Sequence, residues 1–165
     1  RLPWLVINMF TSSLSAFIVS LFESSIAQMA LLAVLMPMVA NQAGNTGQQA
    51  LAVMIRQLAT ESFDARRSWG AVFRESKIGL GSGIFMAALA YAGVMGISGN
   101  ARLASVMGVA LLLDMLLGAM AGGAIPLVLR ALGRDPAQAS SIFLTALTDS
   151  GGFFIFLGLA TAFLL

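Results

Sequence analysis

Five long apolar stretches alternate with short polar connections along the chain. They cover residues of about 3–22, 26–58, 78–97, 103–132 and 137–164. A helix rises 1.5 Å per residue and about 20 apolar residues cross the hydrocarbon core of a bilayer, so each stretch is long enough to span a membrane. Short connections make consecutive helices antiparallel neighbours. The pattern therefore predicts an all-α integral membrane protein built as one bundle of five transmembrane helices.

The second stretch is longer than one straight span requires and has a polar middle. Pro37 precedes a run of amides and glycines between Asn41 and Gln49, which predicts a kinked or locally unwound helix. Polar groups at this depth are tolerated where they line a cavity, or where they join helices by hydrogen bonds. Both interpretations stay open here. The candidate pore residues of this stretch are Gly44, Asn45, Gly47 and Gln48.

The last stretch carries one acidic residue, Asp149, near the middle of a segment that spans roughly 40 Å as a helix. Thr145, Ser141 and Gln138 precede it at helical spacing, so the four polar side chains form one stripe. A carboxylate at this depth costs at least about 2.5 kcal/mol and faces a bundle interior or an aqueous path. Asp149 is therefore the candidate cation ligand, and a structural hydrogen bond to a neighbouring helix is the alternative.

Three further acidic residues are candidates for chemistry. Asp114 lies in the middle of the fourth stretch, where it is either a second ion ligand or the partner of a nearby polar group. Glu75 and Asp135 lie at the ends of stretches on one side of the membrane, where they are candidates for a regulatory divalent-cation site. Asp135 also precedes Pro136, which is typical of an N-cap.

Composition narrows the chemistry and orients the chain. Of its 165 residues, 59% are hydrophobic and 10% charged, with no cysteine and no histidine, so a bound cation would be a hard one held by oxygen ligands. If five spans alternate, eight of the nine basic residues fall on one side and only Arg102 on the other. This bias predicts a multi-pass protein of the plasma (inner) membrane with the N-terminus in the cytoplasm and the C-terminus outside. Residues 61–77, with Trp69 and Phe73 among arginines, are expected to lie at the membrane interface.

The second stretch resembles a known signature. Residues 37–49, Pro-Met-Val-Ala-Asn-Gln-Ala-Gly-Asn-Thr-Gly-Gln-Gln, are similar to the second-span motif of the MgtE magnesium channels. Arg74-Glu75 with Gly79, Gly118 with Pro126, and Asp135-Pro136 with residues 145–152 resemble the third, fourth and fifth spans of that family. The resemblance covers essentially the whole chain.

The resemblance implies a homodimer in the lipid bilayer, with its pore on the two-fold axis and lined by the second and fifth helices of both protomers. Asp149 falls on the acid that binds largely hydrated Mg²⁺, the transported ion. The flanking oxygens would accept hydrogen bonds from the water shell of Mg²⁺ or of other divalent cations. These belong to Asn45, Gln48, Gln138, Ser141 and Thr145. Because the chain begins at Arg1, soluble regulatory domains upstream, an acidic domain and a pair of CBS domains in that family, are expected to be missing.

Three functions compete. A Mg²⁺-selective channel conducting into the cytoplasm is the first, and a cation-coupled secondary transporter of divalent metal ions is the second. An intramembrane aspartyl enzyme using Asp114 and Asp149 is the third, but the residues flanking these two acids do not match the Tyr-Asp and Gly-x-Gly-Asp patterns of such proteases. The sequence therefore predicts a transport protein that is not an enzyme.

Overall fold

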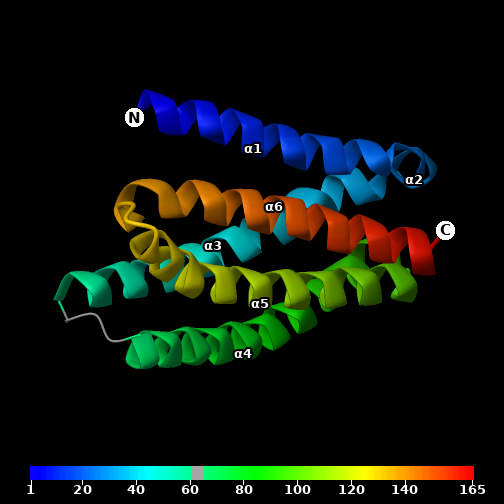
Figure 1. Ribbon diagram of the computed structural model, residues 1–165. Helices are drawn as coiled ribbons and strands as arrows, with labels where there is room; N and C mark the ends of the chain where they lie inside the picture. The colour runs from blue at the N-terminus through cyan, green and yellow to red at the C-terminus, as the bar shows by residue number, and fades with distance from the viewer. Residues whose placement is uncertain (61–64) are drawn as a thin grey trace.

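The computed structural model describes residues 1–60 and 65–165, which form six helices and, within these ranges, no strand. In chain order they are α1 (Leu2–Leu21), α2 (Glu23–Gln28), α3 (Leu31–Thr60), α4 (Ala65–Ser98), α5 (Ala101–Ala131) and α6 (Pro136–Phe163). The five long helices run in alternating directions, so the two ends of the chain lie at opposite ends of the bundle (Figure 1). The prediction of an all-α fold is confirmed.

Four of the described helices are long and apolar enough to cross a membrane: α1, α4 from Arg66 onward, α5 and α6. The fifth long helix, α3, has the length for a crossing, but its polar middle between Asn41 and Gln49 lowers its apolar character. Length and composition therefore support a membrane protein with at least these four candidate spans. Helix α3, the fifth long helix, lies within the same bundle as these four (Figure 1).

The second and third predicted spans have different limits in the structure. α3 is helical from Leu31 through Pro37 to Thr60, so the expected local unwinding at residues 41–49 is wrong. The interruption lies earlier, at Met29 and Ala30, after the short helix α2. The expected interfacial segment 61–77 is not a separate helix from residue 65 onward, because α4 runs without a break from Ala65 into the third span. Residues 61–64 of that segment lie outside the described part.

Local chemistry at two connections explains where helices end. Gly99 and Gly133 have positive φ angles of 65° and 76°, a conformation that glycine adopts without steric cost after a helix. The Asn100 side chain accepts hydrogen bonds from the backbone of Arg102 and Leu103 at the start of α5. Asp135 does the same for Ala137 at the start of α6, so its predicted N-cap role is confirmed.

Helix α5 is the centre of the bundle and packs against α3, α4 and α6 (Figure 1). The largest apolar core joins the first half of α3, the first half of α5 and the second half of α6 through side chains such as Val39, Leu111 and Phe156. Helix α1 is peripheral, since it packs on α6 and exposes large apolar side chains such as Met9 and Phe10. This arrangement leaves one face of α6 and the adjacent face of α3 uncovered.

Candidate functional site

The predicted stripe of α6 forms a continuous exposed polar surface. Gln138, Ser141 and Thr145 are exposed, and Asp149 is half-buried. They share one side of an uninterrupted helix because their spacing of three or four residues returns to the same face. The structure thus places all four predicted α6 residues together.

Helix α3 extends this surface. The Gln48 side-chain nitrogen donates a hydrogen bond of 3.0 Å to the Ser141 hydroxyl. Asn45 lies almost one turn before Gln48 and is exposed. We call the combined surface the polar face. It consists of Gln48, Gln138, Ser141, Thr145 and Asp149, whereas Asn45 lines a cavity formed with α4 and α5.

Glycines explain why α3 approaches α5 and α6 so closely. Gly47 is buried, and a Cβ atom added to it would lie 2.7 Å from a Leu144 methyl group and 3.0 Å from the Gly118 carbonyl oxygen. Gly44 is half-buried and faces Thr148, 3.8 Å from its hydroxyl oxygen by the same construction. Gly122 in turn packs against the Gly47 carbonyl. These small residues bring the backbones together and so set the position of the polar face.

Asp149 is the only carboxylate of the polar face, and one carboxylate does not make a closed metal site. Among the described residues, no group of three or more acidic side chains could hold a metal ion together. Dehydrated Mg²⁺ requires about six oxygen ligands near 2.1 Å, whereas a hydrated ion needs only hydrogen-bond acceptors around its water shell. The spread of amide and hydroxyl oxygens along the polar face suits the second kind of binding.

Asp114 is more deeply buried than Asp149, and the two carboxyl groups interact electrostatically. The Asp114 side chain is fully buried on α5, and neither carboxylate oxygen has a hydrogen-bond partner within residues 1–60 and 65–165. One of these oxygens packs against Gly152, where a Cβ atom would collide with it. Asp114 therefore packs against α6 from the interior of the bundle, within electrostatic range of Asp149, and is not exposed on the polar face.

Glu75 and Asp135 line separate cavities. Glu75 is buried on α4 beside a cavity of about 200 Å³ between α3, α4 and α5, whose lining includes Gln42, Asn45 and Gln49. Asp135 lines another cavity of about 280 Å³ with Ile55 and Arg130, among others. Within one chain, the two predicted regulatory acids do not share a cavity.

Two contacts from α1 to α6 were not expected from the sequence, and one of them reaches the polar stripe. The Trp4 indole nitrogen donates a hydrogen bond of 3.3 Å to the Gln138 side-chain oxygen, and the hydroxyls of Ser15 and Ser150 lie 2.9 Å apart. The sequence signal for the first contact is weak, because a tryptophan near the end of a span is ordinarily an interface anchor. These contacts hold α1 beside the polar face.

Comparison with known proteins places the chain in a family. A family model for MgtE, described as a divalent cation transporter, matches residues 36–159, which include α4, α5 and nearly all of α3 and α6. The chain belongs to the MgtE family. This membership confirms the resemblance found in residues 37–49.

Curated relatives named magnesium transporter MgtE match nearly the whole chain. The protein from Bacillus subtilis is 38% identical over 164 residues, which is 99% of this chain and 36% of that protein. The protein from Enterococcus faecalis is 33% identical over 165 residues, 99% of this chain and 36% of its own length. The protein from Thermus thermophilus is 35% identical over 161 residues, 97% of this chain and 35% of its own length. The chain thus spans a little over a third of the length of the MgtE relatives it matches.

Proposed function

We propose that this MgtE-family chain forms a Mg²⁺-selective channel as a homodimer, with the pore on the two-fold axis and lined by α3 and α6 of both protomers. The observation that carries the proposal is the uncovered polar face on a chain whose other outer surfaces are largely apolar. Its substrate follows from the relatives, which are named magnesium transporters.

The polar face needs water or a protein partner. A carboxylate facing hydrocarbon costs at least about 2.5 kcal/mol, and the exposed amides and hydroxyls beside it add to this cost. An exposed Met9 or Phe10 on α1 carries no such penalty in lipid. Pairing two copies through the side that carries Asp149 removes the penalty, because the two polar faces then enclose one aqueous path.

Two-fold symmetry also supplies a second carboxylate, which the polar face of a single chain lacks. A two-fold axis along the pore brings two Asp149 carboxylates toward one ion, and their combined charge matches that of Mg²⁺. Mg²⁺ gives up its inner-shell water reluctantly, so binding through the water shell avoids most of the dehydration cost. The oxygens of Gln48, Ser141 and Thr145 accept hydrogen bonds from that shell, and such contacts are weak enough for the ion to leave.

The orientation follows from the arginines. Arg56, Arg67 and Arg130 lie where α3 and α5 end and α4 begins, at one end of the bundle, while Arg102 starts α5 at the other (Figure 1). Positively charged connections face the cytoplasm. We therefore place the N-terminus inside and the C-terminus outside the plasma (inner) membrane.

Single-channel recording tests the proposal. The reconstituted chain is compared with Asp149→Asn, and with Glu23→Gln as a matched carboxylate-to-amide control on the exposed α2. We expect unitary Mg²⁺ currents in the wild type and in Glu23→Gln, and none in Asp149→Asn. Saturable Mg²⁺ flux without unitary currents would instead identify a cation-coupled transporter, and equal currents in all three proteins would remove Asp149 from the pore.

Cross-linking tests the dimer, because the chain contains no cysteine of its own. Thr145→Cys on the polar face should form a disulfide between protomers in native membranes. Ala88→Cys is the control, since it is exposed on α4, which makes no contact with α6. Cross-linking of Ala88→Cys with none of Thr145→Cys would place the interface elsewhere.

A further inference from the structure

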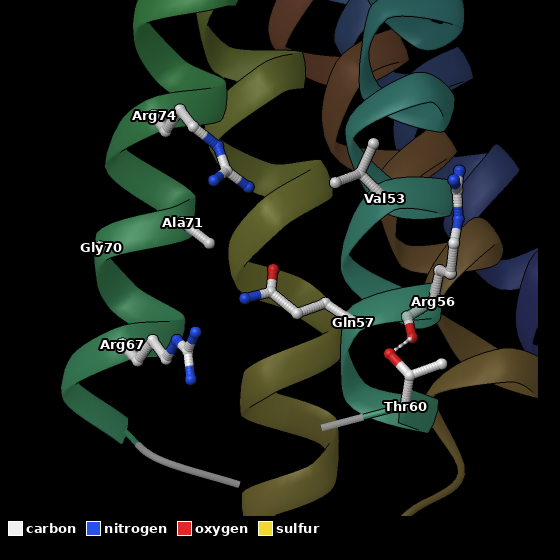
Figure 2. A pocket seen from close by; sticks show the side chains of 8 residues that line it. All are labelled: Val53, Arg56, Gln57, Thr60, Arg67, Gly70, Ala71 and Arg74. Atoms are coloured by element: carbon white, nitrogen blue, oxygen red, sulfur yellow. Dashed lines mark hydrogen bonds between the residues drawn. The ribbon is translucent and has the colours of Figure 1, made fainter. Parts of the chain in front are cut away.

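A basic cavity lies between the end of α3 and the start of α4. Its volume is about 440 Å³, and its lining includes Arg56 and Gln57 from α3 and Arg67, Gly70 and Arg74 from α4 (Figure 2). The two helices make few direct contacts because both pack on α5 instead. The space between their ends is therefore left open, with α5 behind it (Figure 2).

The described side chains that line this cavity carry positive charge only. Among residues 1–60 and 65–165, its ionisable lining residues are Arg56, Arg67 and Arg74. Arg67 and Arg74 are seven residues apart and share one face of α4. Figure 2 shows both guanidinium groups directed toward α3, with the Gln57 amide across the gap from them. The Arg74 Nε atom lies 4.0 Å from the carboxylate of Glu75, and its two terminal nitrogens point into the gap (Figure 2).

Gln57 has an unmet hydrogen bond. Its side-chain oxygen is buried and has no partner in the part of the chain that the structure describes. This oxygen is an acceptor and does not itself bind a phosphate oxygen. The nitrogen of the same amide is directed toward α4 (Figure 2). N–H donors therefore face the gap from both helices.

We propose that this cavity binds a phosphate group, held by the guanidinium groups of Arg67 and Arg74 and by the side-chain nitrogen of Gln57. Paired, planar guanidinium donors suit the tetrahedral oxygens of phosphate, and each charge-assisted hydrogen bond is about twice as strong as a neutral one. This site lies on a different surface from the polar face, so it does not depend on the proposed pore.

Two sources supply such a group, the headgroup of an anionic phospholipid and free phosphate in solution. Neighbouring residues favour the lipid. Trp69 and Phe73 lie on the same stretch of α4 with 49% and 63% of their surfaces exposed, as aromatic side chains do at the headgroup level. Basic pockets between transmembrane helices on the cytoplasmic side suit anionic headgroups.

Native mass spectrometry of the whole chain in detergent tests both sources. One arm adds phosphatidylglycerol or phosphatidylcholine, and the other titrates inorganic phosphate against chloride at equal ionic strength. The variants are Arg67→Gln with Arg74→Gln, and Arg102→Gln, which removes one positive charge at the far end of the bundle. Gln57→Leu serves as an independent variant if the double arginine variant does not fold.

We expect the wild type and Arg102→Gln to retain phosphatidylglycerol in preference to phosphatidylcholine. The double variant should bind phosphatidylglycerol about tenfold or more weakly, because it loses charge-assisted hydrogen bonds to the phosphate group. Gln57→Leu should weaken retention without changing the charge. The wild type could instead bind inorganic phosphate saturably and show no preference between the lipids. If the double variant then loses the phosphate binding, the site is supported with free phosphate as its ligand. Equal retention of both lipids with no phosphate binding, or the same binding in wild type and double variant, would overturn the proposal.

Discussion

Gln48 and Ser141 join two helices across 93 positions of sequence, through a hydrogen bond of 3.0 Å from the Gln48 amide nitrogen to the Ser141 hydroxyl. This hydrogen bond joins the polar residues of α3 and α6 into one continuous surface. Both side chains lie at the surface of the single chain, so the bond is not shielded by the core. Its role is therefore to hold the acceptor oxygens in place rather than to stabilise the fold strongly.

The first prediction concerns this hydrogen bond. Gln48→Leu should reduce Mg²⁺ flux through reconstituted protein, because it removes an oxygen acceptor and places an apolar side chain on the polar face. The free energy of unfolding should change by no more than about 1.5 kcal/mol, the upper end for one hydrogen bond. Gln49→Leu is the matched control, since the exposed Gln49 lines the cavity beside Glu75. Flux reduced equally by both changes would contradict a specific role for Gln48.

The second prediction concerns the helix crossing. Gly47→Ala should lower the stability of the folded chain by about 1–3 kcal/mol, because the added Cβ atom would lie 2.7 Å from Leu144 and force α3 away from α5 and α6. Gly81→Ala on the exposed side of α4 should instead raise stability by about 0.5–1 kcal/mol, since a Cβ atom there meets nothing within 4 Å. Thermal unfolding in detergent measures both. A Gly47→Ala protein as stable as the wild type would show that the contact of α3 with α5 and α6 accommodates a Cβ atom.

The third prediction distinguishes the two interpretations of Asp114. If the residue is structural, Asp114→Asn should leave Mg²⁺ flux unchanged and should not reduce stability, because an uncharged group of the same shape replaces a buried carboxyl without a hydrogen-bond partner in the described residues. If Asp114 is a second ion ligand, flux should fall as it does in Asp149→Asn. We expect the first result, since Asp114 is fully buried and is not exposed on the polar face. Flux and melting temperature are measured on the same preparation.

The fourth prediction separates the helix cap from the regulatory ion site at Asp135. Asp135→Ala should cost about 1 kcal/mol of stability, because the backbone nitrogen of Ala137 loses its side-chain acceptor. Asp135→Asn keeps an acceptor oxygen and should be as stable as the wild type. Inhibition of flux by Mg²⁺ on the cytoplasmic side is the second measurement. Loss of this inhibition in Asp135→Asn would show that the carboxylate also binds an ion.

Much of the fold follows from the sequence because the signals are local. Apolar length predicts the long helices, and Asp135 before Pro136 predicts the start of α6. The α6 stripe is equally local, since helical spacing alone puts Gln138, Ser141, Thr145 and Asp149 on one side. Family membership was also visible in residues 37–49, and the match to the MgtE model confirms it.

The tertiary structure decided what depends on contacts between distant segments. Pro37 and the polar run after it predicted a kinked or locally unwound helix, and α3 is not unwound: Gly44 and Gly47 pack against α5 and α6 within an unbroken helix. Only the crossing of helices shows that Gln48 meets Ser141 while Asp114 is buried behind Gly152. The same applies to the arginine cavity, which exists because α3 and α4 both pack on α5 and leave a gap between them. Helical periodicity acts over a few residues, whereas these relationships depend on how whole helices cross.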